Sequence, residues 1–340
     1  MAALLTACPT DCPQHTEKAG TASDLLLLHQ MVAFAPQAVM MFKVFGRQDT
    51  GQWKAVDLGL LSPQGRLPVQ LDEQGRFVLR DEWRQLDTDT ELRSRLMDGK
   101  VTWRPDVRTP GSSAHLRRLG DLRLQCRASF FSGVARSGIA GTFLGSVLKP
   151  LVNGCDSKLN AWSSFADAPV FGIRLVHGDR ALHLSQSMVG GLRDPAGSSF
   201  DWGYALRHQL FRLPMGDERW PDDARVEFEL VSDPQSPVDD ALLQAPGALS
   251  AVARSLQPGI AWDELKPKLG RDAGMVRYDH SGLRVVRYLQ EQLPEFKQSL
   301  ELVLLLDEQD RLVKFALRAM GEQRLAQAVP DPWSSKPASP

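Results

Sequence analysis

The sequence lacks any apolar run long enough to cross a bilayer. Its longest apolar stretch, Leu25–Ala35, is interrupted by His29 and Gln30, whereas a membrane-spanning helix needs about 20 consecutive apolar residues. A surplus of one charge is also missing, because 40 Lys and Arg nearly balance 41 Asp and Glu. Without a basic surplus, we expect no nucleic-acid partner, and any membrane contact would have to be made through an anchor.

Sequence signatures of common enzyme classes are missing as well. There is no G-x-S-x-G elbow, no H-E-x-x-H motif and no phosphate-binding loop. Ser146–Lys149 fits the S-x-x-K pattern, but no K-T-G follows it, so we interpret the match as chance. We therefore expect no catalytic residues, no metal ligands and no cofactor, in a chain that is not an enzyme.

The composition is that of an ordinary globular protein, with 43% hydrophobic and 24% charged residues among 340. Val39–Gly46 and Arg225–Val231 read as strands, and Gly75 and Gly178 mark two hairpin turns. We expect a mainly β fold with α+β character. Two antiparallel β-rich domains would precede a small C-terminal module of helices and strands.

Composition shifts along the chain divide it into segments. Pro234 and Pro237 mark a linker, after which the apolar pattern becomes helical. The alternating Leu119–Leu124 is expected to be one more strand of the first β domain. The expected segments are a tether 1–24, a β-sandwich-like domain 25–126, a second β-rich domain 127–233, a linker and helix 234–256, the C-terminal module 257–320 and a disordered tail 321–340.

The chain has four cysteines, Cys8, Cys12, Cys126 and Cys155. In an oxidising compartment, Cys126 and Cys155 are the expected disulfide pair. Two buried free thiols are the alternative. Neither a C-x-x-C spacing nor a nearby histidine pair accompanies them, so zinc is not expected. We assign no role to Cys12.

Leu5-Thr6-Ala7-Cys8 resembles the lipobox of bacterial lipoproteins. The resemblance implies lipidation of Cys8, a polar tether over Pro9–Asp24, and a chain anchored at the periplasmic face of the outer membrane. Only Ala2–Leu4 separate Met1 from this motif, without the basic and apolar regions of a secretory signal. Either the true start lies upstream or the match is a chance one, and both alternatives stay open.

A second resemblance covers Gln257–Arg318. It rests on these residues: Pro258-Gly259, Glu264-Leu265, Leu269-Gly270, Tyr288 and the hairpin Asp307–Val313. They resemble the SmpA/OmlA family, which contains the small lipoprotein of the outer-membrane β-barrel assembly machinery and shares its fold with β-lactamase-inhibitory proteins. The resemblance implies two helices on a three-stranded antiparallel sheet, used for protein contacts in the periplasm. Ala261-Trp262 and Pro267 depart from the family pattern.

Tryptophans beside loop residues are the candidates for partner binding. Trp162, Trp202 and Trp220 lie near serine, glycine or proline, and such tryptophans suit interaction surfaces; packing into the core is the alternative. The expected function is a non-catalytic envelope lipoprotein that binds a partner protein in outer-membrane assembly or integrity. The alternative is a periplasmic hydrolase of cell-wall material with a site in 127–233, which a pocket gathering His177, His183 and a carboxylate would favour.

Overall fold

The chain is mainly β, with antiparallel sheets and few helices, as the sequence predicts. The computed structural model describes residues 35, 37–46, 57–62, 65–78, 91–94, 101–131, 155, 162–189, 209–235, 239–269, 274–277, 283–293 and 298–333. Over these ranges every ladder between strands is antiparallel. None of their helices has the length and apolar character needed to cross a membrane.

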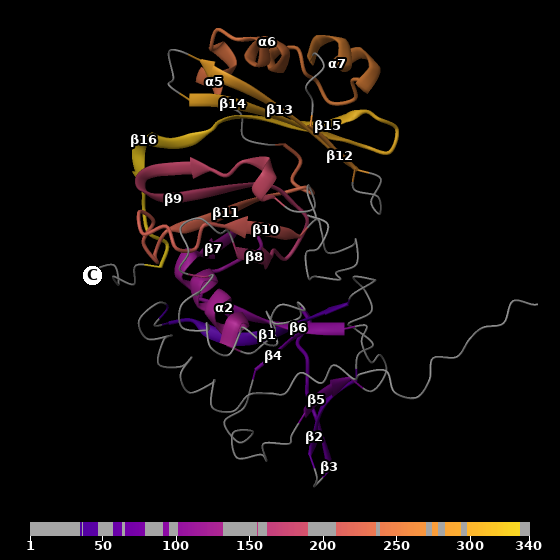
Figure 1. Ribbon diagram of the computed structural model, residues 1–340, viewed down its shortest axis with the longest axis vertical. Coiled ribbons are helices and arrows are strands. Elements are labelled where there is room, and N and C mark those ends of the chain that lie inside the picture. The colour runs from indigo at the N-terminus through magenta and orange to yellow at the C-terminus, as the bar shows by residue number, and fades with distance from the viewer. Residues whose placement is uncertain are drawn as a thin grey trace, which may run out of the picture.

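The N-terminal unit contains two small sheets, at the bottom of the view in Figure 1. The first has the order β4-β1-β6, with bounds Arg76–Phe77, Val39–Gly46 and Val101–Arg108. The second has the order β3-β2-β5, with bounds Gly65–Pro68, Leu58–Ser62 and Glu91–Ser94. The chain turns at Gly75, with φ 75°, but the hairpin expected there was wrong. The strands on either side do not pair with each other: β3 pairs with β2 and β4 pairs with β1.

Helix α2 (Leu119–Phe131) stands where a strand was expected, so the prediction for Leu119–Leu124 was wrong. The helix lies between two layers and buries apolar residues on both sides. Leu122 and Cys126 face the core of the middle unit, while Leu124 joins a separate cluster near β6. Burial on two sides removes the one-sided apolar stripe by which a surface helix is recognised. The expected domain boundary after residue 126 falls inside this helix.

The middle unit is built on a sheet with the order β16-β9-β11-β7. Its strands are β7 (Leu116–Arg118), β9 (Val170–His183), β11 (Arg225–Leu230) and β16 (Gly321–Val329). The backbone N–H of Leu184 donates to the carbonyl of Ile173 at 3.0 Å. Eleven extended residues would span about 36 Å, so β9 must fold back on itself. The hairpin expected around Gly178 is therefore confirmed, with φ 56° at the turn, and Figure 1 shows this reversal.

Alternation along β11 supplies one side of the middle core. Val226, Phe228 and Leu230 are buried, and the residues between them are only partly buried. They pack against a two-stranded sheet of β8 (Trp162–Phe165) and β10 (Leu210–Leu213). The disulfide between Cys126 and Cys155, with an S–S distance of 2.00 Å, joins α2 to this core, so the expected pairing is confirmed.

The C-terminal unit is a four-stranded sheet covered on one face by three short helices (Figure 1). The strands are β12 (Gly274–Arg277), β13 (Arg284–Leu293), β14 (Gln298–Leu306) and β15 (Leu312–Ala319). The helices are α5 (Asp240–Gln244), α6 (Ala248–Arg254) and α7 (Trp262–Leu269). Within the expected bounds 257–320 the described residues form one helix, α7, and four strands, so one helix too many and one strand too few were expected. The segment 234–256, expected to hold a linker and one helix, supplies two helices, α5 and α6, which Pro246-Gly247 separates.

The residues expected to fray after position 320 instead form β16 for part of their length. This strand leaves the C-terminal unit and pairs with the second arm of β9, with Glu322 opposite Leu182. Ion pairs Arg180–Glu322 and Arg324–Asp179, both at 2.6 Å, flank the ladder. The sequence does not predict this strand, because it is an edge strand held by backbone hydrogen bonds. Most of its side chains are exposed.

The disulfide gives a first prediction. Changing both Cys126 and Cys155 to Ala opens a loop whose ends are 29 residues apart. We expect the free energy of unfolding to fall by about 3–4 kcal/mol in urea denaturation, because the unfolded chain regains loop entropy. The variant Cys12→Ser, which keeps the bridge, serves as the control. Alkylation of both thiols in the unreduced, folded protein would contradict the pairing.

Candidate functional site

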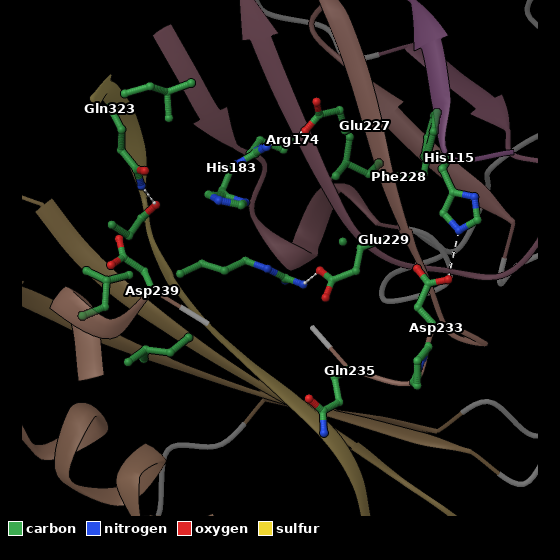
Figure 2. Close-up of a pocket in the computed structure, with 18 residues that line it drawn as sticks. His115, Arg174, His183, Glu227, Phe228, Glu229, Asp233, Gln235, Asp239 and Gln323 are labelled. Atoms are coloured by element: carbon green, nitrogen blue, oxygen red, sulfur yellow. Dashed lines mark hydrogen bonds and ion pairs between the residues drawn. The ribbon is translucent and has the colours of Figure 1, made fainter. Parts of the chain in front are cut away.

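A cavity of about 610 Å³ lies where the middle unit meets the C-terminal unit. Outward-facing residues of β9 and β11 form one wall, and residues of α5, β15 and β16 form the other. Its volume is typical of sites that bind a small molecule or part of a peptide. Figure 2 shows the side chains that surround it.

Strand alternation directs a row of charged side chains into this cavity. On β11, Glu227 and Glu229 point away from the core that Phe228 enters. The register sets Glu227 opposite Arg174 of β9, and the Arg174 guanidinium donates to Glu227 at 2.7 Å. The bond between Leu184 and Ile173 also places His183 opposite Arg174, across the β9 hairpin. His183, Arg174 and Glu227 therefore lie next to one another on three neighbouring strand segments (Figure 2).

An irregularity in β9 shapes the floor of the cavity. Glu229 pairs with Gly172 but Leu230 pairs with Val170, so Phe171 is an extra residue on β9. Such a bulge redirects side chains, and Phe171 is indeed buried with residues of the C-terminal sheet rather than in the middle core. A Cβ at Gly172 would lie 2.3 Å from Nη2 of Arg318, so a side chain there would force this guanidinium to move.

Arg318 of β15 reaches across the junction between the two units. Its guanidinium pairs with Glu229 at 2.6 Å and donates to Oε1 of Gln186 at 3.3 Å. The guanidinium also lies 5.2 Å from the centre of the Phe171 ring, a cation–π distance. Only 4% of the Arg318 side chain is exposed, so these contacts compensate a charge that is almost fully removed from water.

The carboxylates around the cavity already have partners. Glu227 accepts from Arg225 as well as Arg174. Asp233 pairs with the His115 ring at 2.9 Å and accepts from the backbone of Leu230. Asp239 caps α5 by accepting from the Ala241 N–H at 2.9 Å. Because these acids are bound by other groups of the protein, their main effect is to stabilise the fold around the cavity.

Among the residues that line the cavity, His183 has the most strongly shifted pKa. Burial, together with the positive charges of Arg318 and Arg174, lowers its pKa from 6.5 to about 3. The imidazole is therefore neutral at physiological pH, so one ring nitrogen can donate a hydrogen bond and the other can accept one. Within the part of the chain that the structure describes, neither ring nitrogen has a hydrogen-bond partner.

The structure separates most of the residues proposed from sequence. Trp220 is 1% exposed and packs in the middle core beneath the Arg180 guanidinium, 4.8 Å away, so its assignment as a binding residue was wrong. Trp162 begins β8. Cys8 and Trp202 lie outside the described residues. His177 does not join His183; it lies 3.5 Å from Asp223 and is 40% exposed.

Sequence reasoning missed most of the cavity. The alternation of β11 could have shown that Glu227 and Glu229 share one face, but not that β15 covers this face. Arg318 comes from a segment more than 80 residues further along the chain, and nothing local in the sequence relates the two. Within the described residues, no group of three or more His, Cys, Asp or Glu side chains could hold a metal ion.

Comparisons with protein-family models, with curated proteins and with solved structures found no match to this chain.

The depressed pKa of His183 predicts a loss of stability in acid. Above pH 6.5 the imidazole is neutral in both folded and unfolded chains. Below it, the unfolded chain takes up a proton that the folded chain resists until about pH 3. Stability should therefore fall through this window, by up to about 1.4 kcal/mol per pH unit.

Urea unfolding at pH 7, 6 and 5 measures this contribution. His183→Gln should remove it, so its stability should decline less steeply than that of the wild type. His177→Gln, at an exposed position, should keep the wild-type slope. Parallel curves for the wild type and His183→Gln would show that burial of this ring does not produce the effect.

Proposed function

We propose that this chain is a non-catalytic binding protein of the bacterial envelope, with its binding site in the cavity between the middle and C-terminal units. The observation that carries the proposal is the composition of the cavity wall. Charged side chains are held in fixed pairs, such as Arg318–Glu229 at 2.6 Å, beside apolar groups of Leu242, Leu317 and Leu325. Fixed polar groups in an apolar cavity orient a ligand without reacting with it.

The lining residues also argue for binding over catalysis. Neither serine, threonine, cysteine, lysine nor tyrosine is among the described residues that line the cavity, and each carboxylate that lines it is bound by an arginine, a histidine or a backbone N–H. One observation favours the rival, a hydrolase: His115 and Asp233, 2.9 Å apart at the cavity wall, could together activate a water molecule. Hydrolysis of cell-wall fragments that is abolished by His115→Ala would favour this rival.

Two features support the envelope as the setting. The disulfide between Cys126 and Cys155 suits an oxidising compartment, and Leu5–Cys8 resembles a lipobox. The C-terminal unit, with helices on one face of an antiparallel sheet, fits the resemblance to the SmpA/OmlA family and hence a role in protein contacts. In this proposal a lipid on Cys8 holds the chain at the outer membrane, and the partner is an envelope protein.

Expression of the gene with its upstream DNA, in cells fed a fatty-acid analogue, tests the anchor. We expect the wild-type chain to be labelled and Cys8→Ala to be unlabelled, because the thiol accepts the lipid. A photo-crosslinking residue at Gln235, which lines the cavity and is exposed, should then capture an envelope protein. The same residue at Gln309, in an exposed turn away from the cavity, is the matched control.

Each part of this experiment can contradict the proposal. Absence of label on the wild type, or equal labelling of Cys8→Ala, would remove the lipid anchor. Equal crosslinking from positions 235 and 309 would remove the cavity as the place where a partner binds.

A further inference from the structure

Some polar groups around the cavity already form hydrogen bonds within the protein, and others do not. The Nε and Nη2 atoms of Arg174 both donate to one oxygen of Glu227. Its Nη1 has no partner among the described residues, and 37% of the side chain is exposed. The adjacent His183 ring is likewise without a hydrogen bond. One end of the cavity therefore presents two unused donors from neighbouring strand segments.

Two guanidiniums and two glutamates line this end. The charged groups that act on His183 are the guanidiniums of Arg318 and Arg174. Glu229 is paired with Arg318, and Glu227 with both Arg174 and Arg225. An anion placed beside the His183 ring would meet the unused Nη1 of Arg174 and an N–H donor of the ring, an arrangement that favours a carboxylate.

Part of the remaining wall is apolar. Leu242 of α5 and Leu317 of β15 are buried beside the cavity, and Leu325 of β16 contributes to its lining. A volume of about 610 Å³ leaves room for several carbon atoms behind a carboxylate.

We propose that the cavity binds the carboxylate of an apolar ligand, with the carboxylate against Arg174 and His183 and the apolar part against the leucines of α5, β15 and β16. This inference rests on the proposed binding function and names the chemistry of the ligand. Such a carboxylate can end an acyl chain or a peptide. Both sources present the same group to Arg174.

Calorimetric titration of the full chain with two acids and their amides tests this chemistry. The probes are octanoate and N-acetyl-trileucine with a free carboxyl group, each compared with its neutral amide. We expect at least one acid to bind at least tenfold more tightly than its amide, because the amide cannot satisfy the positive charge. Binding of octanoate alone would identify an acyl acid as the source, and binding of the tripeptide alone would identify a peptide terminus.

Variants assign the effect to the proposed residues. Arg174→Gln should weaken binding of the acid at least tenfold. Arg225→Gln is the matched control, because Arg225 pairs with the same Glu227 but does not line the cavity; it should bind as the wild type does. By NMR, the pKa of the His183 ring should rise when the acid is bound, because the anion offsets the field of the two arginines.

Three results would overturn the inference: acids that bind no better than their amides, Arg174→Gln that binds like the wild type, or a His183 pKa that the acid does not move. None of these would affect acylation of Cys8 or crosslinking from position 235. Failure of this inference is therefore distinguishable from failure of the proposed function.

Discussion

The ion pair between Arg318 and Glu229 is the contact on which the rest of this structure depends. It joins β15 of the C-terminal unit to β11 of the middle unit, at a place where only 4% of the arginine side chain is exposed. Two further buried polar residues of the same sheet cross the junction. Glu301 accepts from the backbone N–H of Gln186, and Lys314 donates to the carbonyl of Leu230. A buried charge is costly without its partner, so these contacts favour one relative placement of the two units.

That placement creates the cavity. If the C-terminal sheet lay elsewhere, the outward face of β9 and β11 would be an ordinary solvated sheet face with paired charges. Once β15 covers it, the same side chains become the wall of a partly open cavity. Burial and the charges of Arg318 and Arg174 keep His183 neutral. Glycine at position 172 permits this arrangement, since any side chain there would come too close to Arg318 and Glu229. Strand β16 adds a second connection, because it starts at β15 and ends on β9.

Local patterns predicted the pieces of the fold better than their assembly. Strand β1, the alternation of β11, the hairpin at Gly178 and the Cys126–Cys155 pairing could all be derived from sequence, because each depends on residues near in the chain or on a rare residue type. Helix α2 was missed because it is buried on two sides, and β16 because backbone pairing needs no apolar pattern. The cavity was missed since its two walls are distant in sequence, and no periodicity within either wall encodes their contact.

A double-mutant cycle on Arg318 and Glu229 tests most directly whether this ion pair joins the two units. Arg318→Met and Glu229→Leu each leave one buried charge without its partner, so each should lower the free energy of unfolding in urea by about 3–5 kcal/mol. The double variant leaves no unpaired charge. It should cost less than the sum of the two by at least about 1 kcal/mol, the coupling expected for a direct contact. Additive losses in the double variant would contradict the account, because the two side chains would then contribute independently.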